Sequence, residues 1–204
     1  MTEFPGGALG RRRFLRLGAA TGVLAAFGAP VEAATPESYV QAIATDVMEL
    51  ANTGQKGTAL RGRFANLMNR YINLKGIADY ALGPYRSKLP AGQRGEFYNL
   101  VSNYAAALFV YYVEDFRGTE LQILSSGKQG KFTVISSAIK LKGGGREQVK
   151  WRLAQAGGGY RINDVNLKGV WLTISMKDRF SKVLSKSKGD FAPLFAELRE
   201  ANSW

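Results

Sequence analysis

The 204-residue sequence contains no cysteine and no histidine. Without cysteine the chain has no thiol nucleophile and no disulfide, and without either residue it has no Cys/His zinc site and no histidine-based triad or proton shuttle. The groups that remain for catalysis are carboxylate pairs, lysine, tyrosine or a serine and lysine pair, none of which needs histidine. The composition therefore disfavours an enzyme without excluding one.

Acidic residues are few compared with basic ones. The chain has 28 lysines and arginines against 16 aspartates and glutamates, which gives a formal net charge of +12. Length and composition are those of one globular domain. Such a charge attracts anionic surfaces, of which nucleic acid and anionic lipid are the common ones, although a basic surface that only keeps the protein in solution is the alternative. No nucleic-acid-binding motif is present and the bases are dispersed.

The first 33 residues have the pattern of an export signal. Arg11–Arg13 precede Phe14 and Leu15, and a weakly apolar run continues to Phe27. This is typical of a twin-arginine signal, and the run is too short and too weakly hydrophobic to span a bilayer comfortably. Small residues predict cleavage after Ala33, whereas a basic tail or a retained anchor is the alternative. Because residues 1–33 contain four arginines and two glutamates, the expected domain, residues 34–204, carries +10.

Apolar residues at helical spacing predict four helices in the first half of this domain. They are expected at 36–53, with Thr35 as N-cap, from 58 onward, at 74–82 and at 90–115. The last contains seventeen uncharged residues between Glu96 and Glu114. Polar residues on its other face indicate a helix packed on a sheet rather than a membrane span.

Glycine-rich turns then separate four predicted strands, at 119–126, 131–142, 147–156 and 160–167. In the third strand Val149, Trp151 and Leu153 alternate with polar residues, so one face is apolar. Neither triple-glycine run continues as a phosphate-binding loop does, so both are interpreted as hairpin turns. Two closing helices are expected at 172–186 and at 190–201, the second with Asp190 as N-cap. The predicted fold class is α+β, a four-stranded antiparallel meander covered by about six helices.

Three sequence blocks, at 78–86 (ADYALGPYR), 93–97 (QRGEF) and 160–170 (YRINDVNLKGV), resemble the MlaC family, also called the toluene-tolerance family. The resemblance runs from Pro36 to Trp204. The chain departs from the common pattern at Tyr160, where tryptophan is usual, and at Trp171, where serine is usual. It also has Asp178 and Arg179 where the family commonly has a Tyr-Arg pair. Hopanoid-associated relatives share the pattern, so the lipid need not be a standard phospholipid.

The resemblance implies a non-enzymatic periplasmic lipid carrier of a Gram-negative bacterium, without a cofactor or a metal. It implies a cone-like sheet, akin to nuclear transport factor 2, whose helices enclose an apolar cavity for acyl chains. It also implies an inner-membrane ABC transport complex and an outer-membrane lipoprotein complex as partners, between which phospholipid is carried. Two other functions stay open: an enzyme on the same fold, and a basic adaptor that encloses no ligand.

Candidate contacts follow from the apolar sheet face and the opposing helices. We expect acyl chains to meet Tyr80, Leu82, Tyr85, Phe97, Val101, Tyr104, Leu108, Val134, Val149, Trp151, Ile162 and Val165. For each of these, a closed core is the competing interpretation. Bases expected near the headgroup are Arg86, Arg94, Lys142, Arg146 and Lys150. Two ion pairs are predicted within the family-like blocks, Asp79 with Arg86 and Asp164 with Arg161.

Overall fold

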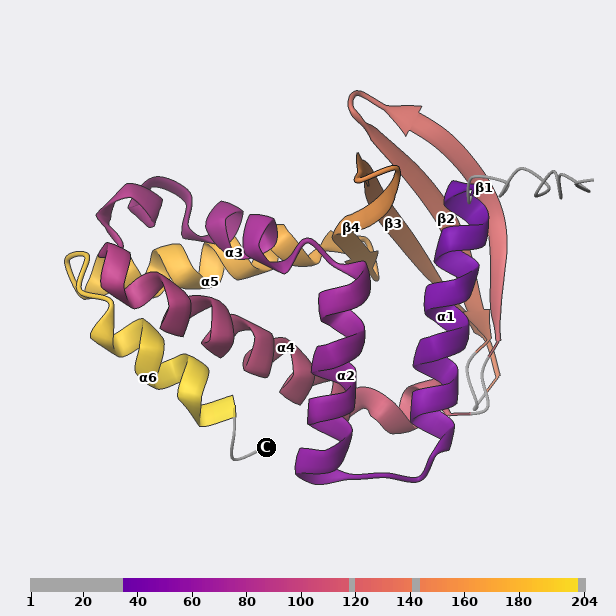
Figure 1. The fold of residues 1–204 in the computed structure, drawn as a ribbon, viewed down its shortest axis with the longest axis horizontal. Coiled ribbons are helices and arrows are strands. Elements are labelled where there is room, and N and C mark those ends of the chain that lie inside the picture. Colours follow the sequence, from indigo (N-terminus) through magenta and orange to yellow (C-terminus); the bar gives the residue numbers. More distant parts are fainter. Residues whose placement is uncertain (1–34, 118–119, 141–143, 202–204) are drawn as a thin grey trace, which may run out of the picture. The chain divides into compact units, whose positions relative to one another are not determined.

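The computed structural model of this protein describes residues 35–117, 120–140 and 144–201, all within the unit Ala33–Trp204 (Figure 1). The predicted export signal and the headgroup candidate Lys142 lie outside the described residues. The predicted order of helices and strands can therefore be compared with the structure over nearly the whole expected domain.

The first half of the described chain is helical, as predicted. It contains α1 (Pro36–Asn52), α2 (Gly57–Tyr71), α3 (Leu74–Leu82), the 3₁₀ segments η1 (Gly83–Lys88) and η2 (Ala91–Gln93), and α4 (Arg94–Phe116). Thr35 caps α1, since its side chain accepts a hydrogen bond from Ser38 N at 3.1 Å. The long helix begins later than expected because Pro90 is extended, with ψ 140°, and one 3₁₀ turn precedes α4.

The sheet is an antiparallel meander of five strands in sequence order. The strands are β1 (Leu121–Gln129), β2 (Phe132–Lys140), β3 (Arg146–Ala156), β4 (Gly159–Leu167) and β5 (Val170–Trp171). The sequence predicted four strands and missed β5, which pairs with the end of β4 through Leu167 and Val170. A strand of two residues leaves no alternation in the sequence, so periodicity could not reveal it.

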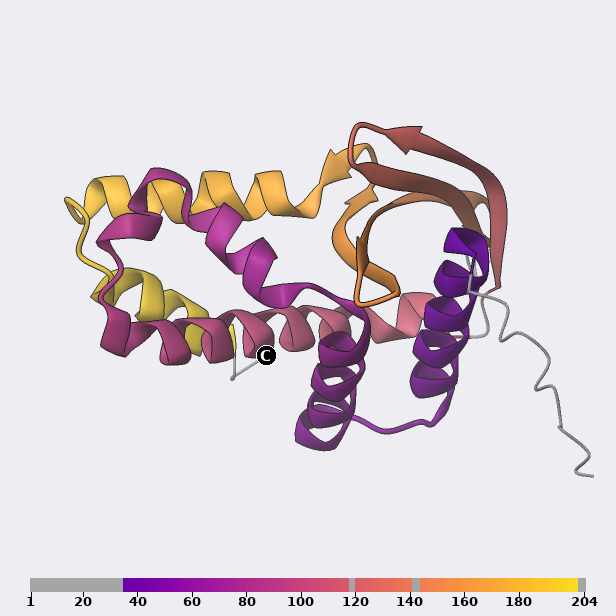
Figure 2. The ribbon, with the colours of Figure 1, turned by 45° about the horizontal axis from the view of Figure 1, so that its top comes forward.

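The strand register places one apolar face toward α1. Ile135 lies opposite Trp151, which in turn lies opposite Val165. A register shift after Arg152 puts Ile162 opposite Leu153, so these two remain on the apolar face. α1 contacts β1 and β2, and Figure 2 shows how strongly the long strands curve. The apolar face is therefore the inner face of a curved sheet.

Two helices close the chain, α5 (Leu172–Lys186) and α6 (Ala192–Glu200). The bounds of α5 are those predicted. α6 starts two residues after Asp190, whose side chain nevertheless accepts a hydrogen bond from Ala192 N at 3.0 Å. Asp190 thus satisfies an N–H of the first turn, as expected of a capping aspartate, although Phe191 occupies the N-cap position.

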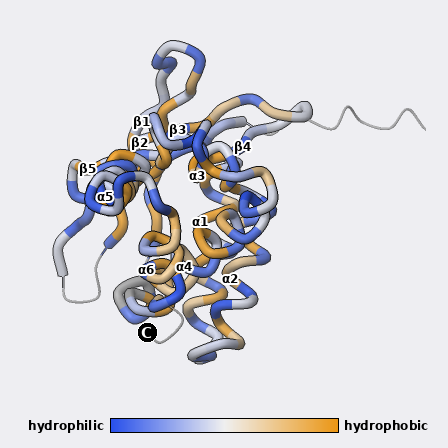
Figure 3. Tube along the Cα trace, turned by 90° about the vertical axis from the view of Figure 1, so that its left-hand side faces the viewer, coloured by the Kyte–Doolittle hydropathy of each residue, from blue (hydrophilic) through white to orange (hydrophobic). Residues whose placement is uncertain are grey.

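Buried apolar side chains form three clusters. The helical core joins α3, the first half of α4, α5 and α6, and the second cluster joins α1 and α2 to the end of α4. The third, here called the sheet cluster, joins α1 to the inner face of the sheet through Val40, Ile43, Ile135, Leu153 and Ile162. Figure 3 shows hydrophilic and hydrophobic residues alternating along α2, which buries Leu60, Leu67 and Met68.

Candidate functional site

Six of the twelve acyl-chain candidates lie in the helical core. Leu82, Phe97 and Val101 are fully buried and Tyr104 nearly so, and Tyr85 and Leu108 pack against them. The Phe97 ring lies 6.0 Å from the Phe180 ring in an edge contact and 6.1 Å from the Phe195 ring, centroid to centroid. These six side chains pack against other side chains, as residues of a closed core do.

Four other candidates lie on the inner face of the sheet. Trp151, Ile162 and Val165 belong to the sheet cluster, and Val149 is buried opposite Ser137 and Leu167. Trp151 and Val165 are only half-buried. These two contribute apolar surface that the packing against α1 does not cover completely.

A buried serine supports this face. Trp151 Nε1 donates a hydrogen bond to Ser137 Oγ at 2.9 Å, and Ser137 Oγ donates to the carbonyl of Val149 at 3.0 Å. The two polar groups thereby satisfy each other inside an apolar cluster, which is the condition for burying them at little cost. Trp151 is consequently held in one orientation on the inner face.

Two candidates are not brought together with the others. Val134 lies opposite Arg152 in the register, on the outer face of the sheet. Tyr80 is 51% exposed on α3, and the Lys177 ammonium lies 5.3 Å from its ring centroid. The twelve candidates therefore divide between the helical core, the inner sheet face and the surface, and they do not surround one space.

Sequence reasoning missed a group of tyrosines at the edge of the sheet cluster. The Tyr39 ring lies 5.6 Å from that of Tyr71 and 6.0 Å from that of Tyr160, centroid to centroid. Tyr39 donates its hydroxyl hydrogen to the carbonyl of Tyr71 at 3.0 Å, and Tyr71 donates to Asp46 Oδ2 at 2.7 Å. Burial raises the pKa of both Tyr39 and Tyr71. In the sequence, the one signal for this edge is that Tyr39 and Tyr71 lie near helix ends and combine an apolar ring with a polar hydroxyl group.

The headgroup candidates come from separate elements. Arg86 in η1 forms an ion pair with Asp79 at 3.0 Å, which confirms that predicted pair. Arg94 is exposed at the start of α4. Arg146 and Lys150 lie on β3, where Arg146 donates to Gln122 at 3.4 Å and Lys150 stands opposite Ser136 on the outer face. The described bases of this set do not converge on one phosphate-sized point.

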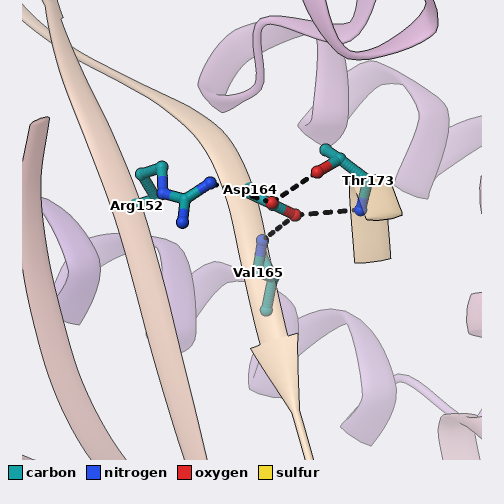
Figure 4. Close-up of polar contacts among 4 residues, drawn as sticks. All are labelled: Arg152, Asp164, Val165 and Thr173. Atoms are coloured by element: carbon teal, nitrogen blue, oxygen red, sulfur yellow. Dashed lines mark hydrogen bonds and ion pairs between the residues drawn. The ribbon is translucent and has the colours of Figure 1, made fainter. Parts of the chain in front are cut away.

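The predicted pair of Asp164 with Arg161 was wrong. Asp164 lies opposite Arg152 in the register, and Arg152 Nη1 contacts its Oδ2 at 3.3 Å (Figure 4). Arg161 instead donates to the carbonyl of Asn69 at 3.4 Å. Arg161 and Asp164 lie three residues apart on the same strand, β4. The register between β3 and β4, which the sequence does not reveal, places Arg152 opposite Asp164.

Asp164 is a buried junction between the sheet and α5. Its side chain is 1% exposed and accepts hydrogen bonds from Val165 N at 2.9 Å, Thr173 N at 3.0 Å and Thr173 Oγ1 at 2.5 Å, besides the contact with Arg152 (Figure 4). The bond to Thr173 N satisfies an otherwise unpaired donor in the first turn of α5. Asp79 and Asp164 are thus each paired with an arginine.

Two surface hollows flank α1. One, of about 450 Å³, lies between α1 and α2 and is lined by Asp46, Glu49, Leu50, Thr53, Arg63, Asn66, Leu67 and Arg70. The other, of about 330 Å³, lies between α1 and the start of β1. Neither is lined by any of the twelve acyl-chain candidates. Both are open to solvent and rich in charged or amide side chains, unlike a closed apolar ligand site.

Residues 35–117, 120–140 and 144–201 contain neither a cluster of metal ligands nor a membrane-spanning helix. In this part of the chain no three acidic side chains come together as metal ligands would. Nor does any helix there combine the length and apolarity needed to cross a membrane.

Comparison with known proteins gives a family and a fold. The family model described as MlaC protein matches residues 40–200. A solved structure, the phospholipid-binding protein from Ralstonia solanacearum in complex with a phospholipid, is similar with a TM-score of 0.68 and 19% sequence identity, over 81% of this chain and 96% of that one. None of the curated proteins compared with this chain matches it.

Proposed function

This chain belongs to the MlaC family, and we propose that it is a phospholipid carrier of the bacterial periplasm. The observation that carries the proposal is the match of the family model over residues 40–200, nearly all of the described chain. The likeness in fold to a protein that was solved with a phospholipid supports it. The export pattern in residues 1–33 agrees with this location.

A carrier of this kind removes a solvation barrier and needs no chemistry. Exposing two acyl chains of about sixteen carbons to water costs roughly 25 kcal/mol, at about 0.8 kcal/mol per methylene group. An apolar interior of similar polarity to a bilayer removes most of that cost and still allows release. The absence of cysteine and histidine and the engagement of Asp79 and Asp164 by arginines are consistent with a binding protein rather than an enzyme.

Within the fold, we assign the acyl chains to the inner sheet face rather than to the helical core. The helical core is already filled, with Phe97, Phe180 and Leu82 at or near zero exposure. On the sheet face Trp151 and Val165 are half-buried, and they belong to the same cluster as residues of α1, which contacts β1 and β2. Displacement of α1 from β1 and β2 would widen this space for a tail, with the tyrosines at its edge presenting hydroxyl groups to the polar part of the lipid.

The carrier is further proposed to exchange lipid with an inner-membrane ABC transport system and with an outer-membrane lipoprotein complex. This part rests on family membership. A hopanoid or another lipid in place of a phospholipid is the alternative cargo.

The first test is the lipid content of the protein purified from its native compartment. Mass spectrometry of an organic extract should detect phospholipid at close to one molecule per chain. Protein that carries no lipid and takes none up from liposomes would contradict the proposal, and would leave an adaptor that encloses no ligand.

The second test locates the tails. The chain has three tryptophans, Trp151, Trp171 and Trp204, so a variant with Trp171→Phe and Trp204→Phe reports on Trp151 alone. Phospholipid with brominated acyl chains should quench this fluorescence. The matched control replaces Trp151 and Trp204 and retains Trp171, whose ring stacks on Arg152. Both variants are loaded with brominated phospholipid and separated from vesicles before the measurement, and Trp171 should then be quenched much less than Trp151. Equal quenching in the two variants would contradict the assignment to the inner sheet face.

A further inference from the structure

Exposed aliphatic side chains gather at the junction of β5 and α5. Val170, Leu172 and Ile174 are 50%, 43% and 43% exposed. Among the described residues six large hydrophobic side chains are exposed, and these three fall within five consecutive positions. Single exposed apolar residues need no explanation, but a concentrated group is typical of a contact surface. We call residues 168–174 the β5 edge.

The turn that begins the β5 edge carries a lysine in an unfavourable backbone conformation. Lys168 and Gly169 link β4 to β5 with φ of 51° and 83°, the pattern of a two-residue type I′ turn. The first position of such a turn favours asparagine, aspartate or glycine, and a lysine there costs on the order of 1 kcal/mol. The backbone at Lys168 is therefore locally strained, and strain of this kind is often found at functional surfaces.

The helix that follows adds positive charge on its outer side. From Leu172 to Lys188 the chain has five bases and one acid, Asp178. Lys182 and Lys186, one turn apart, are both exposed on α5. The exposed aliphatic side chains at residues 170–174 thus have Lys168 before them and the lysines of α5 after them. An apolar group next to basic side chains matches the polarity of a bilayer interface with anionic headgroups.

The β5 edge is also held rigid from behind. Asp164 binds Thr173 through both its backbone N–H and its hydroxyl, and the Arg152 guanidinium stacks on Trp171 at 3.9 Å from the ring centroid. A preorganised surface loses little conformational entropy when it binds.

We propose that the β5 edge docks on an anionic phospholipid bilayer, with Val170, Leu172 and Ile174 entering the interface and Lys168, Lys182 and Lys186 over the phosphates. The charge complementarity and the exposed aliphatic side chains select a lipid surface over a second copy of this basic chain. This docking rests on the proposed function, since it gives the carrier its contact with the membrane from which lipid is taken.

The test is cosedimentation of the full chain with vesicles, either of phosphatidylcholine alone or with about a third phosphatidylglycerol. Binding to the anionic vesicles should be measurable and should weaken as salt is raised. The triple variant Val170→Ser, Leu172→Ser and Ile174→Ser should bind about tenfold more weakly or worse. Leu124→Ser is the matched control, since Leu124 is 50% exposed on β1 and its loss should leave binding unchanged.

A second variant separates docking from folding. Lys168→Asn suits the left-handed position better, so thermal unfolding should show equal or higher stability, while vesicle affinity should fall about fivefold through the lost charge. No binding of the unchanged protein to anionic vesicles, or equal binding of the triple variant, would overturn the proposal and leave the β5 edge as a protein contact.

The lipid content of the triple variant distinguishes this proposal from the proposed function. Phospholipid should still copurify with the variant in the same amount. Absence of lipid from both proteins, with vesicle binding intact, would overturn the carrier function but support the docking surface.

Discussion

The guanidinium carbon of Arg152 lies 3.9 Å from the centroid of the Trp171 ring, and the same guanidinium forms an ion pair with Asp164 at 3.3 Å. One side chain from β3 thus binds an acid on β4 and an aromatic ring on β5. Because α5 begins at the residue after Trp171, this contact lies where the helix leaves the sheet. The contact adds to the backbone pairing of β5 with the end of β4, which runs through Leu167 and Val170.

Replacement of Asp164 by asparagine should destabilise the fold strongly. The change removes the charge that pairs with Arg152 and at least one acceptor for Thr173, at a side chain that is 1% exposed. Loss of one partner of a buried pair costs about 3 kcal/mol or more. Urea denaturation followed by circular dichroism measures this. The control is Glu96→Gln, which removes an exposed pair with Arg199 and should cost under about 1 kcal/mol. Similar losses in both variants would contradict the central role of Asp164.

Replacement of Trp171 by leucine should cost about 1 to 2 kcal/mol, because a stacked cation and aromatic ring of this geometry contributes roughly that amount when partly desolvated. Arg152→Lys keeps the charge but loses the planar stack. In a double-mutant cycle the loss of stability in the double variant should therefore be smaller than the sum of the losses in the two single variants. Strictly additive losses would show that the stacking is energetically irrelevant.

Replacement of Phe97 by alanine should cost about 3 to 5 kcal/mol, the range for deleting a fully buried aromatic side chain. Phe97 is fully buried and contacts the rings of Phe180 and Phe195. Leu124→Ala, at an exposed position, is the control and should change stability by under about 0.5 kcal/mol. A small loss at Phe97 would instead indicate a loosely packed space suited to a ligand.

Stability should fall in alkaline solution. Burial raises the pKa of Tyr39, Tyr71 and Tyr98, and a hydrogen bond to Asp79 raises that of Tyr98 further. A group whose pKa is higher in the folded state contributes stability that is fully present below its unfolded pKa, about 10, and is lost as pH rises through the folded value. Urea midpoints measured from pH 8 to 11.5 should therefore decline above about pH 10. Tyr98→Phe should decline less steeply, and an unchanged slope would count against this origin.

Two glycines should respond oppositely to alanine. Gly62 lies inside α2 with open space around its Cβ position, so Gly62→Ala should stabilise by about 0.5 to 1 kcal/mol through helix propensity. Gly158 lies in the turn between β3 and β4 at φ 79°, so Gly158→Ala should destabilise by about 1 kcal/mol or more. Thermal unfolding measures both. A stabilising change at Gly158 would mean that this turn rearranges.

The secondary structure could be predicted from local signals. Helical spacing and the cap at Thr35 located α1, and glycine turns with alternating residues located β3 and β4. These signals act within a few residues and need no tertiary context. β5 could not be predicted, because two residues have no periodicity and are held by pairing with the end of β4 and by the contact of Trp171 with Arg152.

The candidate site could be predicted only in part. An apolar helical stripe is the same whether it faces a ligand or another helix, so Phe97 and Val101 could not be distinguished from core by their spacing. Val134 was assigned to the inner face although the register puts it on the outer one, opposite Arg152. The tyrosines at the edge of the sheet cluster come from three separate elements, which only folding brings together.

The sequence by itself determined the family, the order of helices and strands, the basic charge and the lack of thiol and imidazole chemistry, since these depend on composition and on short-range pattern. The tertiary structure decided which apolar residues meet, which arginine binds Asp164 and where aliphatic side chains remain exposed. Those outcomes depend on strand register and helix packing, where a shift of one residue moves a side chain to the opposite face.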